Sequence, residues 1–169
     1  HQNVVLQASP IKFNIFNDSL KSGKHILLHD VGDPQNIGSI LRTSFLFNID
    51  SVILTRQCSH LSPIVAKASS GALDILAKSG RIKYVERASD LLTLSPVDKF
   101  AAVLSDHQFL SQVKYNDGLV VLGGEGDGLP KKIVDLCNNR VSIDTKKDDI
   151  VDSLNVGVAA GILINKLFS

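Results

Sequence analysis

The chain has few cysteines, almost no net charge and no long apolar run, and each absence excludes a class of protein. Its two cysteines, Cys58 and Cys137, lie far apart and match no metal-ligand spacing. We expect both thiols to be reduced and partly buried, as in a reducing compartment. No apolar run approaches the length of about 20 residues that a membrane-spanning helix requires. Eighteen basic side chains balance 17 acidic ones, so nucleic-acid binding would need a local patch.

The spacing of the histidine and serine residues argues against a metal site and against a hydrolase nucleophile. His25 and His29 have HxxxH spacing, but they lie in the run expected to be a strand and not on a helix, and neither His60 nor His107 adds an HExxH pattern, so we expect no metal site. No serine lies in a G-x-S-x-G turn, which argues against a hydrolase nucleophile of that kind. The chain opens at His1 rather than at a methionine, and we expect the natural protein to contain a segment upstream of it.

The 169 residues alternate between short apolar runs and helical patterns, which predicts one α/β domain. We expect strands at 24–29, 51–54, 83–85, 100–104, 118–122 and 141–143. We expect helices at 36–47, 62–79, 88–94, 130–137 and 153–167. This order predicts a parallel sheet that helices cover on both faces. Residues 1–23 show no clear periodicity and are expected to be a linker before a domain spanning 24–169.

The densest glycine cluster, Gly123–Pro130, follows the strand expected at 118–122. A dinucleotide fingerprint that starts at Gly124 would need a third glycine where Leu129 stands. A phosphate-binding P-loop would need Lys and Ser or Thr where Leu129 and Pro130 stand. The cluster therefore favours a ligand loop at the carboxyl end of a strand over a plain turn, without naming the ligand.

The segment Asp33–Ser44 predicts the start of a helix near a possible ligand. Pro34 favours an extended Asp33, and Asn36 then stands where a helix N-cap is expected. Arg42 follows nearly two turns later. It is either a surface arginine or an arginine at the edge of a cleft, where its guanidinium would suit a phosphate.

A third segment, Asp152–Gly161, combines a helix start with small residues. Ser153 is a natural N-cap, and the glycines and alanines after it predict very close helix packing. Tight core packing alone does not account for Asn155, because a buried amide needs hydrogen-bond partners.

Taken in this order, the three segments resemble the SpoU (TrmH-like) branch of the SPOUT RNA methyltransferases over about residues 24–167. The residues that carry the resemblance are Asn36, Gly38, Arg42 and Thr43 in the first block, Gly123, Glu125, Gly126, Gly128 and Leu129 in the second, and Ser153, Leu154, Asn155, Val156 and Ala159 in the third. Asp144 departs from the family pattern, since a proline often stands there, and the stretch Asp144–Asp152 is longer than usual.

The resemblance implies a fold, a cofactor and a site. The fold would be a parallel sheet with a C-terminal deep trefoil knot, in a homodimer with the site near the subunit interface. The cofactor would be S-adenosylmethionine, held by Leu104, Leu122, Gly123, Gly124, Gly126, Gly128, Ile143, Asp144 and Leu154. The catalytic residues would be Arg42, Asn36, Glu125, Ser153 and Asn155, with Glu125 as the charge partner of Arg42.

The implied reaction is methylation of a ribose 2'-hydroxyl in RNA, and overall similarity favours a guanosine of large-subunit ribosomal RNA. A transfer RNA is the alternative substrate. A non-catalytic module that binds RNA or cofactor, and a Rossmann-type nucleotide enzyme, remain as other classes. The resemblance favours the mitochondrial matrix, with the cytoplasm as the alternative.

Overall fold

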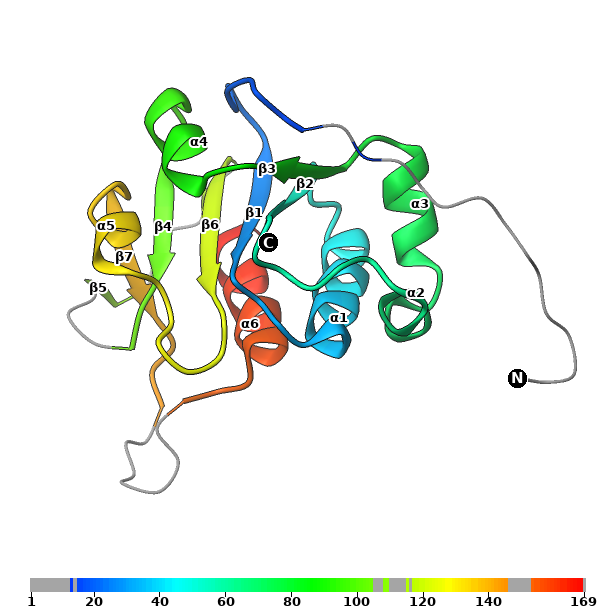
Figure 1. Cartoon of the computed structure of the whole chain (residues 1–169). Coiled ribbons are helices and arrows are strands. Elements are labelled where there is room, and N and C mark those ends of the chain that lie inside the picture. The colour runs from blue at the N-terminus through cyan, green and yellow to red at the C-terminus, as the bar shows by residue number, and fades with distance from the viewer. Residues whose placement is uncertain are drawn as a thin grey trace, which may run out of the picture.

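A seven-stranded parallel sheet forms the centre of the molecule (Figure 1). The computed structural model describes residues 13, 15–104, 108–109, 115, 117–145 and 153–168. The strands are β1 (Lys24–His29), β2 (Ser51–Thr55), β3 (Ile82–Val85), β4 (Lys99–Ala102), β5 (Gln108–Phe109), β6 (Gly118–Gly123) and β7 (Asn139–Ser142), in the order β3-β2-β1-β6-β4-β7-β5. All six neighbouring pairs are parallel, which confirms the expected sheet.

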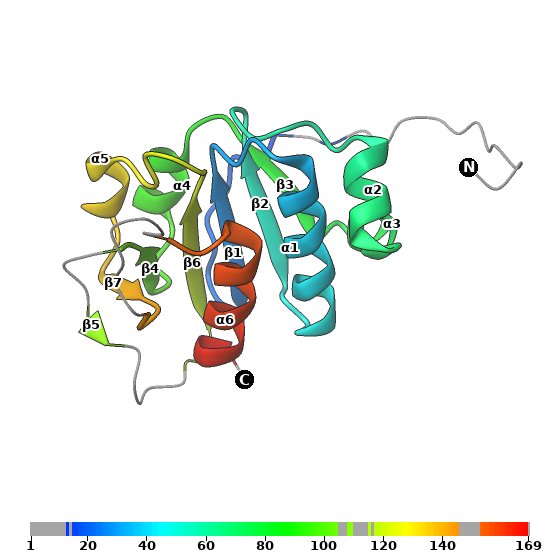
Figure 2. The same cartoon turned by 90° about the horizontal axis from the view of Figure 1, so that it is seen from below.

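Helices cover both faces of this sheet, as expected (Figure 2). The helices are α1 (Pro34–Leu46), α2 (Pro63–Ser69), α3 (Ala72–Lys78), α4 (Ala88–Leu94), α5 (Lys131–Val134) and α6 (Val156–Phe168). Ile26 and Leu28 of β1 pack on the face of α1 and α6, whereas Leu27 packs on the face of α4 and α5. All three side chains are fully buried, and each such burial contributes about 1.5–3 kcal/mol to folding.

Helix α1 lies unusually close to α2 because Gly38 has no side chain. A Cβ atom built on Gly38 would lie 2.5 Å from the Ala68 Cβ and 2.8 Å from the Val65 carbonyl oxygen. Any side chain here would therefore separate the two helices, and with them the segment that carries Asn36. Gly38 of the first block thus allows α1 to pack closely on α2.

Three helix boundaries differ from the sequence prediction. Asp33, and not Asn36, caps α1, since its carboxylate accepts from the Gln35 N–H at 2.9 Å. The helix expected over 62–79 is two helices, because Ser70 and Gly71 adopt left-handed φ angles of 50° and 89°. The helix expected over 130–137 is shorter, since α5 has four residues.

The segment expected to be a linker is in part packed against the sheet. The Phe16 N–H donates to the Tyr84 carbonyl at 2.6 Å, and Leu20 is 3% exposed. Residues 1–12 lie outside the described residues. Within the described part of the chain, no helix has the length and apolar character needed to cross a membrane.

Candidate active site

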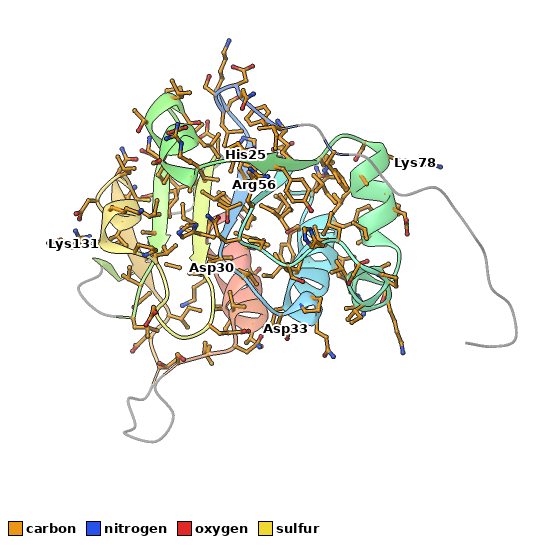
Figure 3. All side chains as sticks on the ribbon, viewed as in Figure 1. His25, Asp30, Asp33, Arg56, Lys78 and Lys131 are labelled. Atoms are coloured by element: carbon orange, nitrogen blue, oxygen red, sulfur yellow. The ribbon has the colours of Figure 1, made fainter. Side chains whose placement is uncertain are left out.

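The candidate site lies at the carboxyl edge of the sheet, where β1 and β6 are neighbours. The chain continues from β1 to β2 and β3 on one side, whereas β4, β7 and β5 lie beyond β6 on the other. Such a reversal of strand order opens a crevice between the connections, which is where α/β proteins bind ligands. Figure 3 shows Asp30 and Asp33 on the connection that leads from β1 to α1 at this edge.

The glycine loop after β6 packs tightly against that connection. A Cβ atom built on Gly124 would lie 1.9 Å from the Asp30 carbonyl oxygen, and one on Gly123 would lie 2.4 Å from the Gly128 carbonyl carbon. The Gly124 N–H donates to the His29 carbonyl at 2.9 Å. Gly123 and Gly124 therefore serve the close approach of backbone to backbone. Of the glycines in this loop, only Gly126 and Gly128 are exposed, and a Cβ atom built on either of them would have no neighbour within 4 Å.

Three polar side chains from distant segments form one hydrogen-bonded chain at this edge. Asn36 in the first turn of α1 donates from Nδ2 to Oε1 of Glu125 in the glycine loop. Asn155 donates from Nδ2 to Oδ1 of Asn36 at 2.9 Å. The Asn155 Oδ1 accepts from the N–H groups of Gly157 at 2.9 Å and Val158 at 3.3 Å. Asn155, rather than the expected Ser153, therefore caps α6 and also holds Asn36 in place.

Burial differs along this hydrogen-bonded chain. Asn36 is only 6% exposed, so its two amide contacts satisfy a polar group that would otherwise be costly. Glu125 and Asn155 are exposed. The arrangement therefore presents one carboxylate and one amide to a ligand, on a buried support.

Arg42 does not join this group. Its Nη1 donates to the Ser70 Oγ at 3.3 Å, at the end of α2. Among the residues that the structure describes, no carboxylate lies within ion-pair distance of Arg42, so Arg42 and Glu125 are not paired within this single chain. The reason is helical geometry: six residues are about one and two thirds turns, which places Arg42 on another side of α1 than Asn36.

The residues expected to hold a cofactor follow the carboxyl ends of β4, β6 and β7, which are neighbouring strands. Leu104 is 63% exposed and Leu154 is 39% exposed, so both side chains are accessible to a ligand. Ile143 is partly buried, and Asp144 and Ser153 are exposed. Leu122 is 2% exposed within the core, so its side chain is not available to a cofactor.

Two residues beside the glycine loop have features that the sequence patterns did not indicate. Asp30 has a left-handed φ of 59°, which is uncommon outside glycine. The Nδ1 atom of His29 is buried without a hydrogen-bond partner in the described structure. Burial lowers the pKa of His29, and Lys132 adds to this effect while Asp30 opposes it. Neither feature has a signal in the sequence, because both depend on the packing of the glycine loop.

The two thiols are free, as expected: Cys58 is buried and Cys137 is partly buried. Burial raises the pKa of Cys137 to about 11, so this thiol is a weak nucleophile at neutral pH. The described residues hold no group of three histidine, cysteine or carboxylate side chains placed to bind a metal ion.

Comparison with known proteins identifies the family. The profile of the SpoU rRNA methylase family matches residues 23–165. The mitochondrial rRNA methyltransferase 1 of Dictyostelium discoideum is 32% identical over 206 aligned positions, which cover the whole chain and 39% of the relative. A solved structure from Porphyromonas gingivalis, of the TrmH family of RNA methyltransferases, superposes with a TM-score of 0.73 at 30% identity, covering 88% of this chain and 60% of that one.

A SpoU methyltransferase from Streptomyces viridochromogenes, solved with AdoMet, has the same fold, with a TM-score of 0.74 at 19% identity over 87% of this chain and 60% of that one. The chain thus spans between 39% and 60% of the length of these relatives. The match over residues 23–165 shows that the chain belongs to the SpoU rRNA methylase family.

Proposed function

We propose that this chain transfers a methyl group from S-adenosylmethionine to a ribose 2'-hydroxyl of RNA, with a guanosine of large-subunit ribosomal RNA as the target. The observation that carries the proposal is the pair of hydrogen bonds that connects Glu125, Asn36 and Asn155. These residues come from the three blocks of the SpoU pattern and meet beside the glycine loop. Membership of the family supports RNA methylation. The name of the Dictyostelium relative supports ribosomal RNA and a mitochondrial location.

The proposed cofactor would bind at the carboxyl ends of β4, β6 and β7. The residues that fit it are the open glycines 126 and 128, the backbone of 122–124, and the side chains of Leu104, Ile143, Asp144 and Leu154. The exposed leucines would cover apolar parts of the ligand, and the loop would bind through backbone groups. The Streptomyces relative was solved with AdoMet, which supports this choice of cofactor. The cofactor would supply a methyl group on a positively charged sulfur.

The protein side chains would position the hydroxyl and manage its proton. A hydroxyl attacks well only if its proton leaves during the reaction. The Glu125 carboxylate, held by Asn36, is exposed and could accept a hydrogen bond from the ribose, with Ser153 and Asn155 orienting the sugar. The Arg42 guanidinium would bind an RNA phosphate, exchanging its bond to Ser70 for a stronger one. The phosphate or a water molecule would then take the proton.

Membership of the SpoU family also leads us to propose the domain bounds 24–169 and a C-terminal trefoil knot. Helix α6 follows β7 in the chain but packs against α1 and β6, two strands away from β7. A return of this kind suits a knotted end. The connections 105–107, 110–114 and 146–152 lie outside the described residues.

The test is methyl transfer from labelled S-adenosylmethionine to total ribosomal RNA and transfer RNA by the full-length protein, followed by mapping of the modified ribose. Label in ribosomal RNA at a guanosine 2'-oxygen supports the proposal, and label in transfer RNA alone favours the alternative substrate. Cofactor binding without transfer to either would indicate a non-catalytic module.

The variant Arg42→Ala tests the phosphate role within that assay. It should keep cofactor binding and lose methyl transfer by a factor of about 100 or more, because positioning contributes several kcal/mol. The matched control is Lys78→Ala, an exposed basic residue on α3. Near-normal turnover of Arg42→Ala would remove Arg42 from the site.

A further inference from the structure

A cavity lies on the β3 side of the molecule. It has a volume of about 330 Å³ and is lined by Phe13, Ile15, His60, Leu61 and Tyr84. None of these residues belongs to the candidate active site. The volume is at the lower end of the range for small-ligand pockets.

The lining of this cavity suits a flat, aromatic ligand. The rings of Phe13 and Tyr84 lie 5.3 Å apart at an interplanar angle of 56°, and the His60 imidazole is exposed at the opening. Unpaired nucleobases are recognised by stacking on such rings. Burial raises the pKa of Tyr84, with a smaller opposing effect from the Leu61 backbone. The phenol therefore keeps its proton and can donate a hydrogen bond to a base.

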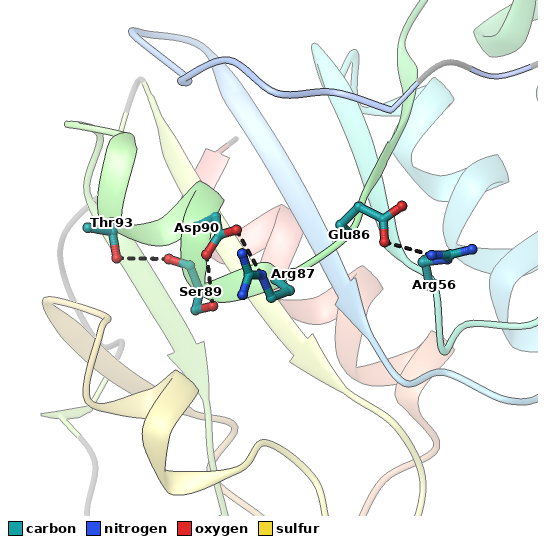
Figure 4. A network of polar contacts seen from close by, with 6 residues as sticks. All are labelled: Arg56, Glu86, Arg87, Ser89, Asp90 and Thr93. Carbon is teal, nitrogen blue, oxygen red and sulfur yellow. Dashed lines mark hydrogen bonds and ion pairs between the residues drawn. The ribbon is translucent and has the colours of Figure 1, made fainter.

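A guanidinium follows the strand that pairs with β3. Leu54 and Tyr84 are register partners on β2 and β3, and Arg56 and Glu86 follow them by two residues, just after the carboxyl ends of these strands. Figure 4 shows the ion pair between them, with Arg56 Nη1 2.8 Å from Glu86 Oε2. Both side chains are exposed, at 68% and 46%, and such pairs contribute at most about 1 kcal/mol. A phosphate can therefore replace Glu86 at little cost.

The loop that carries Arg56 and His60 is fixed to the candidate active site. The Asp30 N–H donates to Thr55 Oγ1 at 3.3 Å, and the Ser59 N–H donates to the Val31 carbonyl at 3.0 Å. Asp30 and Val31 belong to the connection that leads to Asn36. These two hydrogen bonds connect the loop that borders the cavity to the β1–α1 connection of the candidate site.

We propose that this cavity is a subsite for an unpaired nucleobase of the RNA that flanks the methylated nucleotide, with Arg56 binding the adjacent phosphate. The inference rests on the proposed function, because it takes RNA as the substrate. Its first test does not depend on methyl transfer, so the two can fail separately.

The chain offers a direct probe of this subsite, because Tyr84 and Tyr115 are its only tyrosines. In the variant Tyr115→Phe, labelling with 3-fluorotyrosine leaves one fluorine signal, from Tyr84. AMP, GMP, CMP and UMP are titrated separately, with ribose 5-phosphate as the control without a base. We expect at least one nucleotide to shift the signal in a saturable way and ribose 5-phosphate to leave it unchanged.

Variants at the rim sharpen this measurement. We expect Arg56→Gln and His60→Ala each to weaken nucleotide binding by about fivefold or more, since loss of one stacking or phosphate contact has that effect. Lys78→Ala is the matched control and should bind normally. If none of the four nucleotides shifts the fluorine signal, the proposal is overturned. An equal shift with ribose 5-phosphate also overturns it. A signal that moves only when residues 1–12 are deleted would assign the cavity to the chain's own first residues, which also overturns it.

The second test separates the subsite from catalysis. In the full-length enzyme, Arg56→Gln should raise the KM for RNA by about fivefold or more while kcat and the Kd for S-adenosylmethionine stay within twofold, because the subsite binds only RNA. An unchanged KM in an enzyme that methylates RNA overturns the subsite alone. Absence of methyl transfer in the unmodified enzyme would instead contradict the proposed function.

Discussion

At the scale of single residues, Asn36 connects parts of the chain that are far apart in sequence. It binds Glu125 and Asn155, which are 89 and 119 positions away. Its amide is almost fully buried, so the two contacts compensate for lost hydration. The role of Asn36 is therefore as much to assemble the site as to touch a substrate.

Replacing Asn36 tests this role. Asn36→Ala should lower the free energy of unfolding by about 1–3 kcal/mol, because it removes two hydrogen bonds and leaves the Asn155 amide without its acceptor. Urea unfolding followed by circular dichroism measures the change. Gln35→Ala, an exposed neighbour on the same turn, is the control and should have little effect. Equal stability of Asn36→Ala and the unmodified chain would contradict the structural role.

His25 makes the stability of the chain depend on pH. Its Nε2 lies 2.7 Å from the Ser22 carbonyl and its Nδ1 2.7 Å from the Ser51 Oγ, and burial lowers its pKa below 6.5. The unfolded chain therefore binds a proton first as the pH falls. The free energy of unfolding is highest above the ordinary pKa, decreases as the pH falls through it, and levels off below the folded pKa.

We expect urea midpoints to fall between about pH 7.5 and pH 5, and to fall less in His25→Gln, which cannot titrate there. Because burial also lowers the pKa of His29, the variant should keep part of the slope. Identical slopes in the two proteins would rule out His25 as a source of the pH dependence.

At the scale of elements, the start of α6 depends on one side chain. The Asn155 Oδ1 accepts from two N–H groups of the first turn. Asn155→Ala should therefore reduce stability by about 1 kcal/mol and also release Asn36. Thermal unfolding measures this, with Asn165→Ala, an exposed position on the last turns of α6, as the control. If both variants melted at the same temperature, the capping role would be wrong.

A second prediction at the scale of elements concerns the glycine loop. Gly124→Ala should reduce stability by about 1–3 kcal/mol, because the new Cβ meets the Asp30 carbonyl at 1.9 Å and must displace backbone. Gly32→Ala is a nearby control, since a Cβ there has nothing within 4 Å. A well-tolerated Gly124→Ala would mean that the loop and the β1–α1 connection can move apart.

At the scale of the whole molecule, the expected homodimer can be tested at the layer formed by α1 and α6. These helices pack side by side (Figure 2), and Val158 in the first turn of α6 is 52% exposed. We expect a dimer by sedimentation and a monomer for Val158→Asp. An acidic residue in the first turn suits the helix dipole, so the variant should still fold. Ile75→Asp on α3, at similar exposure, is the control. A monomeric unmodified chain would contradict the dimer.

The sequence was most informative where a local pattern has one structural solution. The apolar runs of β1 and β6 and the period of α1 predict their elements, because burial on both faces of a parallel sheet requires such runs. The break between α2 and α3 was not predictable in this way. The apolar period continues across Ser70 and Gly71, and the left-handed turn depends on where α2 meets α1.

The sequence by itself determined the α/β class, the positions of the main strands and the three blocks that indicate the family, because these depend on order and periodicity along the chain. Only the tertiary structure decided which of those residues meet. It brought Asn36, Glu125 and Asn155 into contact and directed Arg42 toward Ser70. The physical reason is that hydrogen bonds across 89 and 119 positions depend on strand order and helix rotation, which no local pattern encodes.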